Sequence, residues 1–254
     1  METIASYKHG VWGQEVLLGV SWDKLWLVCT TVLALIIIHA IVMAVLRKKA
    51  QPSAEGKRIR RHDAFDRAFH WIMAASVIVL LITGVLPIVG IHFNWLNLHL
   101  IAGLILTFVI ALHIIRAVIW QDFKSMLMGP SDLVEPLDAS KKPGKYSFAQ
   151  KGMHWTMTIL VLGVIYTGII LFLQIQTPWW ERTNAMPESE LGMMFFLHGL
   201  ATLGLIALSA IHVYFGLRPE KRFYTRSMIK GWISENEYTA NHDSSKWAAE
   251  ESSK

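Results

Sequence analysis

The stretch LHLIAGLILTFVIALHIIR, residues 98–116, decides the fold. It is nearly all apolar, and about 20 apolar residues allow a helix to cross the ~30 Å hydrocarbon core of a bilayer. It nevertheless carries His99 and His113, although polar groups are costly at that depth. The whole chain of 254 residues is 53% hydrophobic with a mean hydropathy of +0.38, which is too apolar for an ordinary soluble domain. We therefore predict an integral membrane protein whose membrane histidines have a function.

Five stretches of this kind predict an all-α bundle of five transmembrane helices. They lie at about Trp22–Leu46, Phe69–Ile88, Leu96–Ile119, His154–Phe172 and Met193–Leu217. Twenty of the 24 Lys and Arg residues follow the first, third and fifth stretches, starting with Arg47, Lys48 and Lys49, whereas Lys8 and Arg182 lie on the other side. The positive-inside rule then places the N-terminus outside and the C-terminus in the cytoplasm, in a bacterial inner membrane. Because the basic residues follow the membrane boundaries, nucleic acid is not an expected partner.

The sequence has a single cysteine, Cys29, inside the first stretch. One cysteine excludes a disulfide within the chain and a cysteine-based zinc or iron–sulfur site. The haem-attachment motif Cys-x-x-Cys-His is also absent.

Histidine is the polar residue that stands out in the predicted helices. Seven of the eleven histidines lie in or at them: His39, His70, His99, His113, His154, His198 and His212. A lone histidine there is most simply an interhelical hydrogen bond, but seven call for more. His99 and His113 are 14 residues apart, which is ~21 Å of helix and close to four whole turns, so they face the same way. His198 and His212 repeat the spacing, so two such helices can form two histidine pairs, each able to hold a haem b. By this repeat alone, His113 would pair with His212.

Several segments resemble the cytochrome b subunit of respiratory formate dehydrogenases. They are AFDRAFHW (64–71), NLHLIAG (97–103), GKYSFAQKGMHW (144–155), FLHGLATLG (196–204) and AIHVYFGLRPEKRFYTRSMIKGWI (210–233). The similarity runs from about Arg60 to about Trp232, so residues 60–232 are interpreted as a four-helix di-haem domain. Residues 1–48, with the extra helix, are more similar to the N-terminal part of thiosulfate reductase cytochrome b. Residues 233–254 are predicted to form a polar cytoplasmic tail.

The resemblance implies two haems b and names their axial ligands. These would be His99 with His198 on the outer side, and His70 with His212 on the inner side. This pairing differs from the simple repeat, because it leaves His113 without its partner. The family has apolar residues at the places of His113 and His154. Three alternatives stay open for these two histidines: a third haem, a hydrogen bond to quinone, or pairing across helices.

The resemblance also implies a quinone pocket, for menaquinone or ubiquinone, beside the inner haem. The segment GKYSFAQKG (144–152) would line it, with Ser147, Ala149 and Gln150 at the relevant places. Relatives have Asn where Ser147 stands, so that contact differs here. His154 is a further candidate donor to a quinone carbonyl. A competing interpretation makes Gln150 a capping residue of the fourth predicted helix.

Two other features lie at the predicted membrane boundaries. Arg116 is a cation at the inner end of a span, where it can bind a haem propionate or extend to the cytoplasmic surface. Trp179 and Trp180 lie between the fourth and fifth helices, as expected of an aromatic belt at the outer interface.

The predicted function is electron transfer between a partner enzyme and the quinone pool. The resemblance implies an iron–sulfur subunit and a molybdenum- or tungsten-dependent catalytic subunit as partners, on the outer side. A thiosulfate or polysulfide reductase, in which quinol is oxidised instead, is the first alternative. A stand-alone quinol–cytochrome oxidoreductase is the second, and a transporter with a histidine relay is the third. The sequence fixes neither the partner's substrate nor the direction of electron flow.

Overall fold

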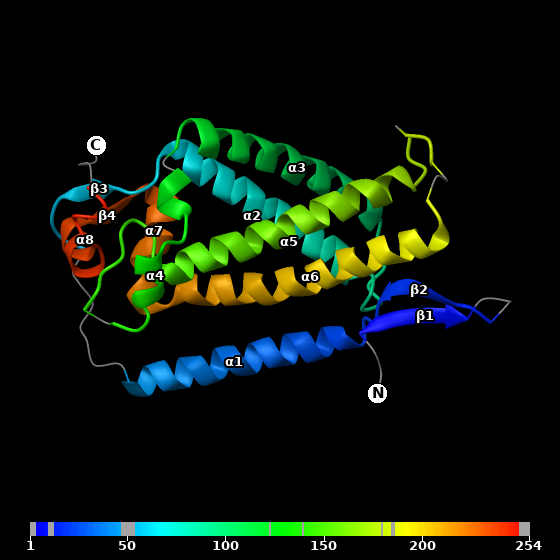
Figure 1. Ribbon diagram of the computed structural model, residues 1–254, viewed down its shortest axis with the longest axis horizontal. Helices are drawn as coiled ribbons and strands as arrows, with labels where there is room; N and C mark the ends of the chain where they lie inside the picture. The colour runs from blue at the N-terminus through cyan, green and yellow to red at the C-terminus, as the bar shows by residue number, and fades with distance from the viewer. Residues whose placement is uncertain are drawn as a thin grey trace. The chain divides into compact units, whose positions relative to one another are not determined.

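The computed structural model describes residues 4–9, 13–46, 54–121, 123–138, 140–178, 180–183 and 186–248. Most of them are helical (Figure 1). The helices are α1 (Lys24–Leu46), α2 (Ala64–Val85), α3 (Trp95–Ile119), α4 (Pro130–Val134), α5 (Phe148–Leu173), α6 (Glu188–Leu217), α7 (Arg222–Lys230) and α8 (Glu235–Asn241). Short 3-10 helices lie at Phe123–Met126 and Pro219–Lys221. The strands are β1 (Ala5–His9), β2 (Glu15–Val20), β3 (Arg58–Arg60) and β4 (Trp232–Ser234).

The predicted membrane helices are confirmed. In the described part of the chain, α1, α2, α3, α5 and α6 are the five helices long and apolar enough to cross a bilayer. Few of their side chains are buried, as expected for helices whose outer faces meet lipid. The topology argument rests partly on Arg47, Lys48 and Lys49, which lie outside the described residues, so the orientation of the termini stays a prediction.

Helices α2, α5 and α6 begin at least five residues before their apolar stretches, and polar residues cap the first two of them. Asp63 and Asp66 form a reciprocal cap at the start of α2: each backbone N–H donates to the other's carboxylate, at 3.3 and 2.7 Å. At the start of α5, the Ser147 N–H donates to the Gln150 carboxamide oxygen at 3.0 Å, and the Gln150 N–H donates to the Ser147 hydroxyl oxygen at 3.4 Å. A hydropathy pattern does not detect these caps, because the first turn of each helix precedes the apolar stretch.

The chain divides into two compact units, each containing parts of several helices. The first comprises residues 1–40, 77–107 and 156–211, and the second comprises residues 41–76, 108–155 and 212–254. Each unit also contains one small antiparallel sheet, β1–β2 in the first and β3–β4 in the second. The expectation of an all-α chain is thus corrected to a mostly helical one, because segments outside the spans satisfy their backbone groups by strand pairing.

The first unit joins its hairpin to helix α6. β1 and β2 pair from Ala5↔Val20 to His9↔Glu15 (Figure 1). Val20, Leu25 and Leu203 form a buried cluster against which further apolar side chains of α1, α2 and α6 pack. Gly192 allows the hairpin to approach closely, since a Cβ there would overlap the carbonyl oxygen of Leu17. Backbone atoms of β2 therefore lie directly on α6.

Replacing Gly192 with alanine is expected to displace the hairpin. The overlap is with backbone, so β2 must move, and overpacking of this kind costs about 1–3 kcal/mol. Hydrogen exchange at residues 15–20 should become faster. Gly103→Ala is the control, because its Cβ would meet Leu80 Cδ2 at an ordinary 3.9 Å. Equal exchange in both variants would show that the hairpin does not depend on this approach.

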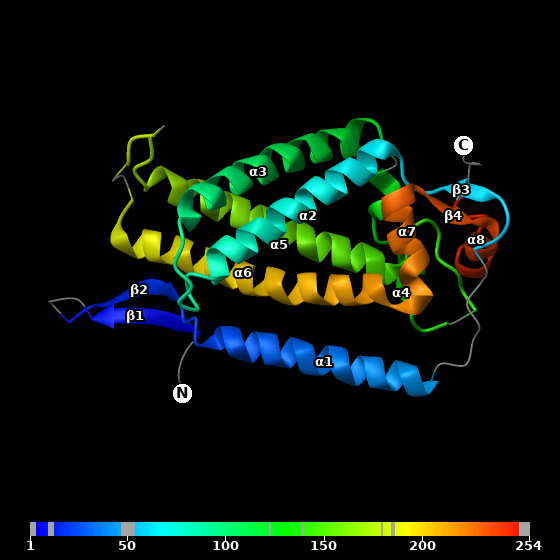
Figure 2. The same ribbon diagram turned by 180° about the vertical axis from the view of Figure 1, so that it is seen from behind.

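The second unit contains a small folded region beyond the helix ends. β3 pairs with β4, and Ile59, Phe223, Ile233 and Tyr238 form its buried cluster. Helices α7 and α8 lie beside this sheet (Figure 2). The predicted boundary after residue 232 falls inside β4, so residues 233–248 pack with the segment before α2. The division into a haem domain and a tail stays a prediction.

Arg61 and His242 fasten the C-terminal segment to this region. Arg61 is only 3% exposed; it donates to the Lys145 carbonyl at 2.6 Å and lies 3.1 Å from His242 Nε2. The His242 Nδ1–H donates to the Gly144 carbonyl at 2.7 Å, which leaves Nε2 as an acceptor. Burial, and then the nearby Arg61, lowers the pKa of His242 to about 4. The imidazole is therefore neutral at pH 7.

Acidification is expected to loosen this C-terminal segment. The pKa of folded His242, about 4, lies below the ordinary 6.5, so protonation favours the open form. The stabilisation is complete above pH 6.5 and declines as the pH falls toward 4. Hydrogen exchange at residues 235–247, corrected for intrinsic rates, should rise between pH 7 and pH 5. His242→Gln, which cannot gain the proton, should lose this pH dependence; retention of it would assign the effect to another group.

Candidate functional site

His99 and His198 face each other within the first unit. His99 comes from the first turns of α3 and His198 from the first half of α6. Their ring centres are 6.4 Å apart, and the ring planes are inclined by 61°. The structure thus brings together the two residues that the sequence predicted as the outer pair.

Each ring of the His99–His198 pair is held by a threonine from a neighbouring helix. Thr83 Oγ1 of α2 lies 2.8 Å from His99 Nδ1, and Thr167 Oγ1 of α5 lies 2.8 Å from His198 Nδ1. Both threonines are 2% exposed. The next residues are Gly84 and Gly168, where a Cβ would stand 3.6 and 3.4 Å from the Cε1 atom of the facing histidine. Thr-Gly therefore gives each imidazole a hydroxyl at Nδ1 and open space at Cε1.

His70 and His212 form the corresponding pair in the second unit. Their ring centres are 6.1 Å apart, with the planes inclined by 48°. The neighbouring Trp71 donates its indole N–H to the Met228 carbonyl at 2.9 Å, which ties this end of α2 to α7. Pairing of His212 with His70 follows the family resemblance and not the 14-residue repeat.

Both separations fit two nitrogen ligands on one metal. Metal–imidazole nitrogen bonds of about 2 Å and about 1.1 Å from nitrogen to ring centre place two opposed rings about 6 Å apart. The observed 6.4 and 6.1 Å agree with this spacing. A pair at this distance is too far apart for a direct hydrogen bond between the rings, so the gap suits an atom bound between two nitrogens. The donor set, two neutral imidazoles, suits haem iron.

His113 and His154 lie in the second unit, outside the His70–His212 pair. His113 packs on Phe69, with ring centres 6.0 Å apart. Its Nδ1 is buried and has no hydrogen-bond partner among the residues that the structure describes. His154 is close enough to interact with His113 electrostatically. The roles of His113 and His154 stay predictions.

Arg116 is held by two carboxylates at the start of α2. Its guanidinium contacts Asp63 and Asp66, each at 2.5 Å, and is largely buried. The Gln121 side chain also donates to Asp66. These contacts join the last turn of α3 to the cap of α2. Arg116 lies at the C-terminal end of α3, where a positive charge interacts favourably with the helix dipole. Binding of a haem propionate by Arg116 stays a prediction.

The predicted quinone segment is fixed by hydrogen bonds within the second unit. Ser147 and Gln150 cap α5, so the Gln150 carboxamide oxygen is in use and its NH₂ group is the remaining donor. Ala149 occupies the turn between them. Lys151 donates to both carboxylate oxygens of Asp132 at 2.9 Å and to the Leu127 carbonyl at 3.0 Å. The capping interpretation of Gln150 therefore agrees with the structure, while a quinone contact stays a prediction.

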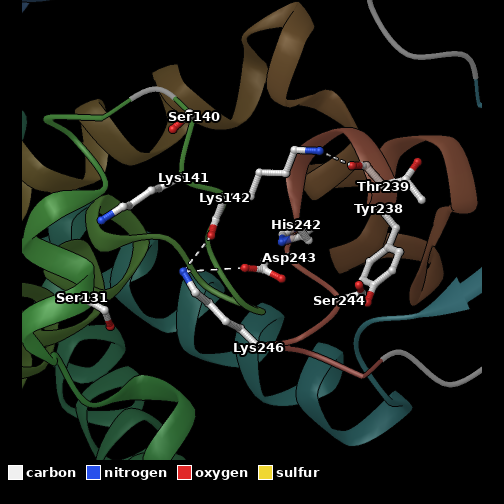
Figure 3. Close-up of a pocket in the computed structure, with 10 residues that line it drawn as sticks. All are labelled: Ser131, Ser140, Lys141, Lys142, Tyr238, Thr239, His242, Asp243, Ser244 and Lys246. Carbon is white, nitrogen blue, oxygen red and sulfur yellow. Dashed lines mark hydrogen bonds and ion pairs between the residues drawn. The ribbon is translucent and has the colours of Figure 1, made fainter.

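A separate cavity of about 670 Å³ lies between residues 131–142 and residues 238–246 (Figure 3). Lys142 donates to the Thr239 carbonyl at 2.7 Å, and Lys246 donates to the Lys142 carbonyl at 3.0 Å. These lysines tie the loop to α8 and the segment after it. The cavity contains none of the membrane histidines, so we do not assign the electron-transfer site to it.

Sequence reasoning did not single out Thr83 and Thr167, although a signal existed. α2 contains His70-Trp71 and α5 contains His154-Trp155, and in both helices Thr-Gly follows after eleven intervening residues. Together with the 14-residue spacing in α3 and α6, this common pattern marks the α2–α3 and α5–α6 hairpins as an internal repeat. A search for repeats between helices would have found both threonines.

Five membrane helices with two pairs of histidines, whose ring centres are 6.4 and 6.1 Å apart, are what a multi-pass membrane cytochrome is expected to have. The comparisons with known proteins narrow this class. The family model described as "Prokaryotic cytochrome b561" matches residues 61–231, more than half of the chain, and the chain belongs to this family. It is a multi-pass cytochrome b of the bacterial inner membrane, and family membership implies haem b as its cofactor.

The similar curated proteins are subunits of one kind of enzyme. The chain is 23% identical over 197 residues to the formate dehydrogenase, cytochrome b556(fdo) subunit of Escherichia coli K12, covering 69% of this chain and 86% of that one. It is 22% identical over 213 residues to the formate dehydrogenase, cytochrome b556 subunit of Haemophilus influenzae, covering 76% and 84%. The resemblance to formate dehydrogenase cytochrome b subunits is thus confirmed.

Proposed function

We propose that this protein is the membrane cytochrome b subunit of a formate dehydrogenase type complex. It would pass electrons between an iron–sulfur subunit, which accompanies a molybdenum- or tungsten-dependent catalytic subunit on the outer side, and the quinone pool on the cytoplasmic side. The names of its relatives support the enzyme class. The observation that carries the proposal is the presence of two histidine pairs, each at the spacing of two axial ligands.

The chain would bind two haems b. His99 and His198 would hold one, and His70 and His212 would hold the other. Bound haem supplies reversible one-electron chemistry, which the side chains lack. Helix α6 contributes His198 and His212, 14 residues or about 21 Å apart along its axis. Each unit of the chain therefore supplies one ligand pair, and α6 is common to both.

The quinone would bind beside His70 and His212, against the start of α5. Ser147, Ala149 and Gln150 would line that pocket, with the Gln150 NH₂ group as a donor to a quinone carbonyl. His154, one turn further along α5, would be a second donor. Two donors, one for each carbonyl, are what an apolar quinone pocket needs for orientation.

The proposal is tested by counting the haems per chain and by measuring which substrate reduces them in the co-purified complex. The chain is purified from membranes in mild detergent, and its haem is measured as the pyridine haemochrome and by reduced-minus-oxidised absorbance. We expect two haems per chain, reduced by formate in the co-purified complex. Absence of haem would overturn the proposal in favour of a transporter. Three haems per chain would assign a further one to His113 and His154. Reduction by quinol, with electrons leaving to thiosulfate or polysulfide, would indicate the reductase alternative.

A further inference from the structure

The two histidine pairs differ in what holds their Nδ1 atoms. In the His99–His198 pair, each Nδ1 lies 2.8 Å from a buried threonine hydroxyl. In the His70–His212 pair, no hydrogen bond to either ring is seen among the described residues. The helices that supply the threonines, α2 and α5, are those of the internal repeat. The threonine contacts therefore distinguish one end of the repeated hairpin from the other.

The threonine contacts also determine which ring nitrogen carries the proton. Thr83 Oγ1 donates its one hydrogen to the Val79 carbonyl at 2.7 Å, and Thr167 Oγ1 donates to the Gly163 carbonyl at 2.7 Å. A hydroxyl that has already donated can only accept, so each histidine must donate from Nδ1–H. In this tautomer Nε2 is the nitrogen with a free lone pair.

We infer that Thr83 and Thr167 are positioning residues that fix the tautomer of His99 and His198 and lower the reduction potential of the haem bound there below that of the haem at His70 and His212. An imidazole that donates from its second nitrogen is a more basic ligand. A more basic ligand stabilises ferric over ferrous iron, and hydrogen bonding to the ligands is one of the protein's means of setting haem potential. Both ligands of one pair have this contact and neither ligand of the other pair does.

A potential difference of this sign gives electron flow a direction. An electron moves from the lower to the higher potential, hence from the His99–His198 pair to the His70–His212 pair. The transfer takes one electron from ferrous iron to ferric iron and involves no proton. This inference rests on the proposed haem ligation and deepens it, because the four histidines alone do not favour either direction.

The test replaces the hydroxyl while keeping the shape of the side chain. Thr83→Val is the first variant, because it removes the hydroxyl beside His99 Nδ1, and Thr167→Val removes the corresponding hydroxyl beside His198 Nδ1. Thr107→Val is the matched control: Thr107 also donates to a carbonyl four residues earlier, Gly103, at 2.8 Å, and it has no hydrogen bond to a histidine among the described residues. Haem content, potentiometric titration of both haems and low-temperature EPR spectra are measured on the purified complex.

In Thr83→Val we expect two haems, with the midpoint of one raised and the other unchanged. About a tenfold change in the ferrous-to-ferric ratio is expected, equivalent to about 59 mV for one electron. Thr167→Val should raise the same midpoint, and Thr107→Val should change neither. Thr83→Ser, which retains the hydroxyl, should restore the original midpoint and EPR signal.

Two results would overturn the inference. One is a Thr83→Val protein with both haems bound and both midpoints unchanged. The other is loss of haem from Thr83→Val that Thr83→Ser does not restore, which would assign the role to side-chain packing. Loss that Thr83→Ser does restore, with the original midpoint, supports the hydroxyl. A wild-type protein with no haem would instead refute the proposed function, so the two failures are distinguishable.

Discussion

Replacing His99 with leucine is expected to remove one haem and leave the other in place. The ring of His99 stands 6.4 Å from that of His198, and no other described histidine is paired with either ring. Leucine fills the space but offers no nitrogen, so the iron would keep one axial ligand. The haemochrome content should fall from two haems per chain to one, and formate-driven quinone reduction should stop.

The remaining haem identifies which pair was broken. In His99→Leu and in His198→Leu, the surviving spectrum and midpoint should be the same, because both variants leave His70 and His212 intact. His212→Leu should leave the complementary spectrum. His92→Leu is the control, since His92 is exposed in the loop before α3 and belongs to neither pair. Retention of both haems in His99→Leu would show that the ligands have been paired wrongly.

The membrane helices were predictable because the bilayer imposes one strong requirement on their sequences. Each must present about 20 apolar residues, so hydropathy finds the spans without any knowledge of packing. The ends were less predictable, as α2 and α5 show. Their first turns are stabilised by the Asp63–Asp66 and Ser147–Gln150 caps, which are polar and therefore invisible to a hydropathy pattern.

The histidine pairs were predictable only in part from spacing. The 14-residue repeat correctly placed His99 and His198 in equivalent positions, and the structure brings them together. It would have paired His113 with His212, but the structure places His70 beside His212, because α2 also contributes a histidine to that unit. A repeat within one helix gives the distance between two residues along the helix axis and shows that they lie on the same face. It does not show which neighbouring helix supplies the partner of each.

The β3–β4 sheet could not be predicted from the sequence for a different reason. β3 and β4 have three residues each and lie more than 170 residues apart in the chain, so no local pattern links them. Their pairing follows from the buried cluster of Ile59 and Ile233 with α7 and α8. Contacts between residues so far apart in the sequence are decided by tertiary packing. The same reason explains why Arg61 and His242 were not recognised as partners.

Replacing Lys151 with methionine is expected to destabilise the segment before α5 by about 3–5 kcal/mol, because Asp132 would stay buried without its cation. Lys151 and Asp132 are 8% and 7% exposed, and the ammonium also holds the Leu127 carbonyl. Burial opposes ionisation of Asp132, but the Gly129 N–H and Lys151 outweigh it and lower the pKa of the carboxyl. Removing the lysine therefore removes a main reason for the carboxylate to be charged inside the protein.

The consequence should be selective for quinone chemistry. The pair fixes residues 127–132 against the first turns of α5, where the proposed quinone pocket lies, and no member of the two haem pairs takes part in it. Lys151→Met should thus retain two haems that formate still reduces, while their reoxidation by added quinone slows.

Lys151→Met combined with Asp132→Leu removes both charges and should recover most of the lost stability. Lys8→Met is the matched control, since its ion pair with Glu188 is exposed and worth at most about 1 kcal/mol. Unchanged quinone reoxidation in a Lys151→Met protein with a loosened 123–135 segment would separate this ion pair from the quinone site, and the pocket would then have to lie elsewhere in the second unit.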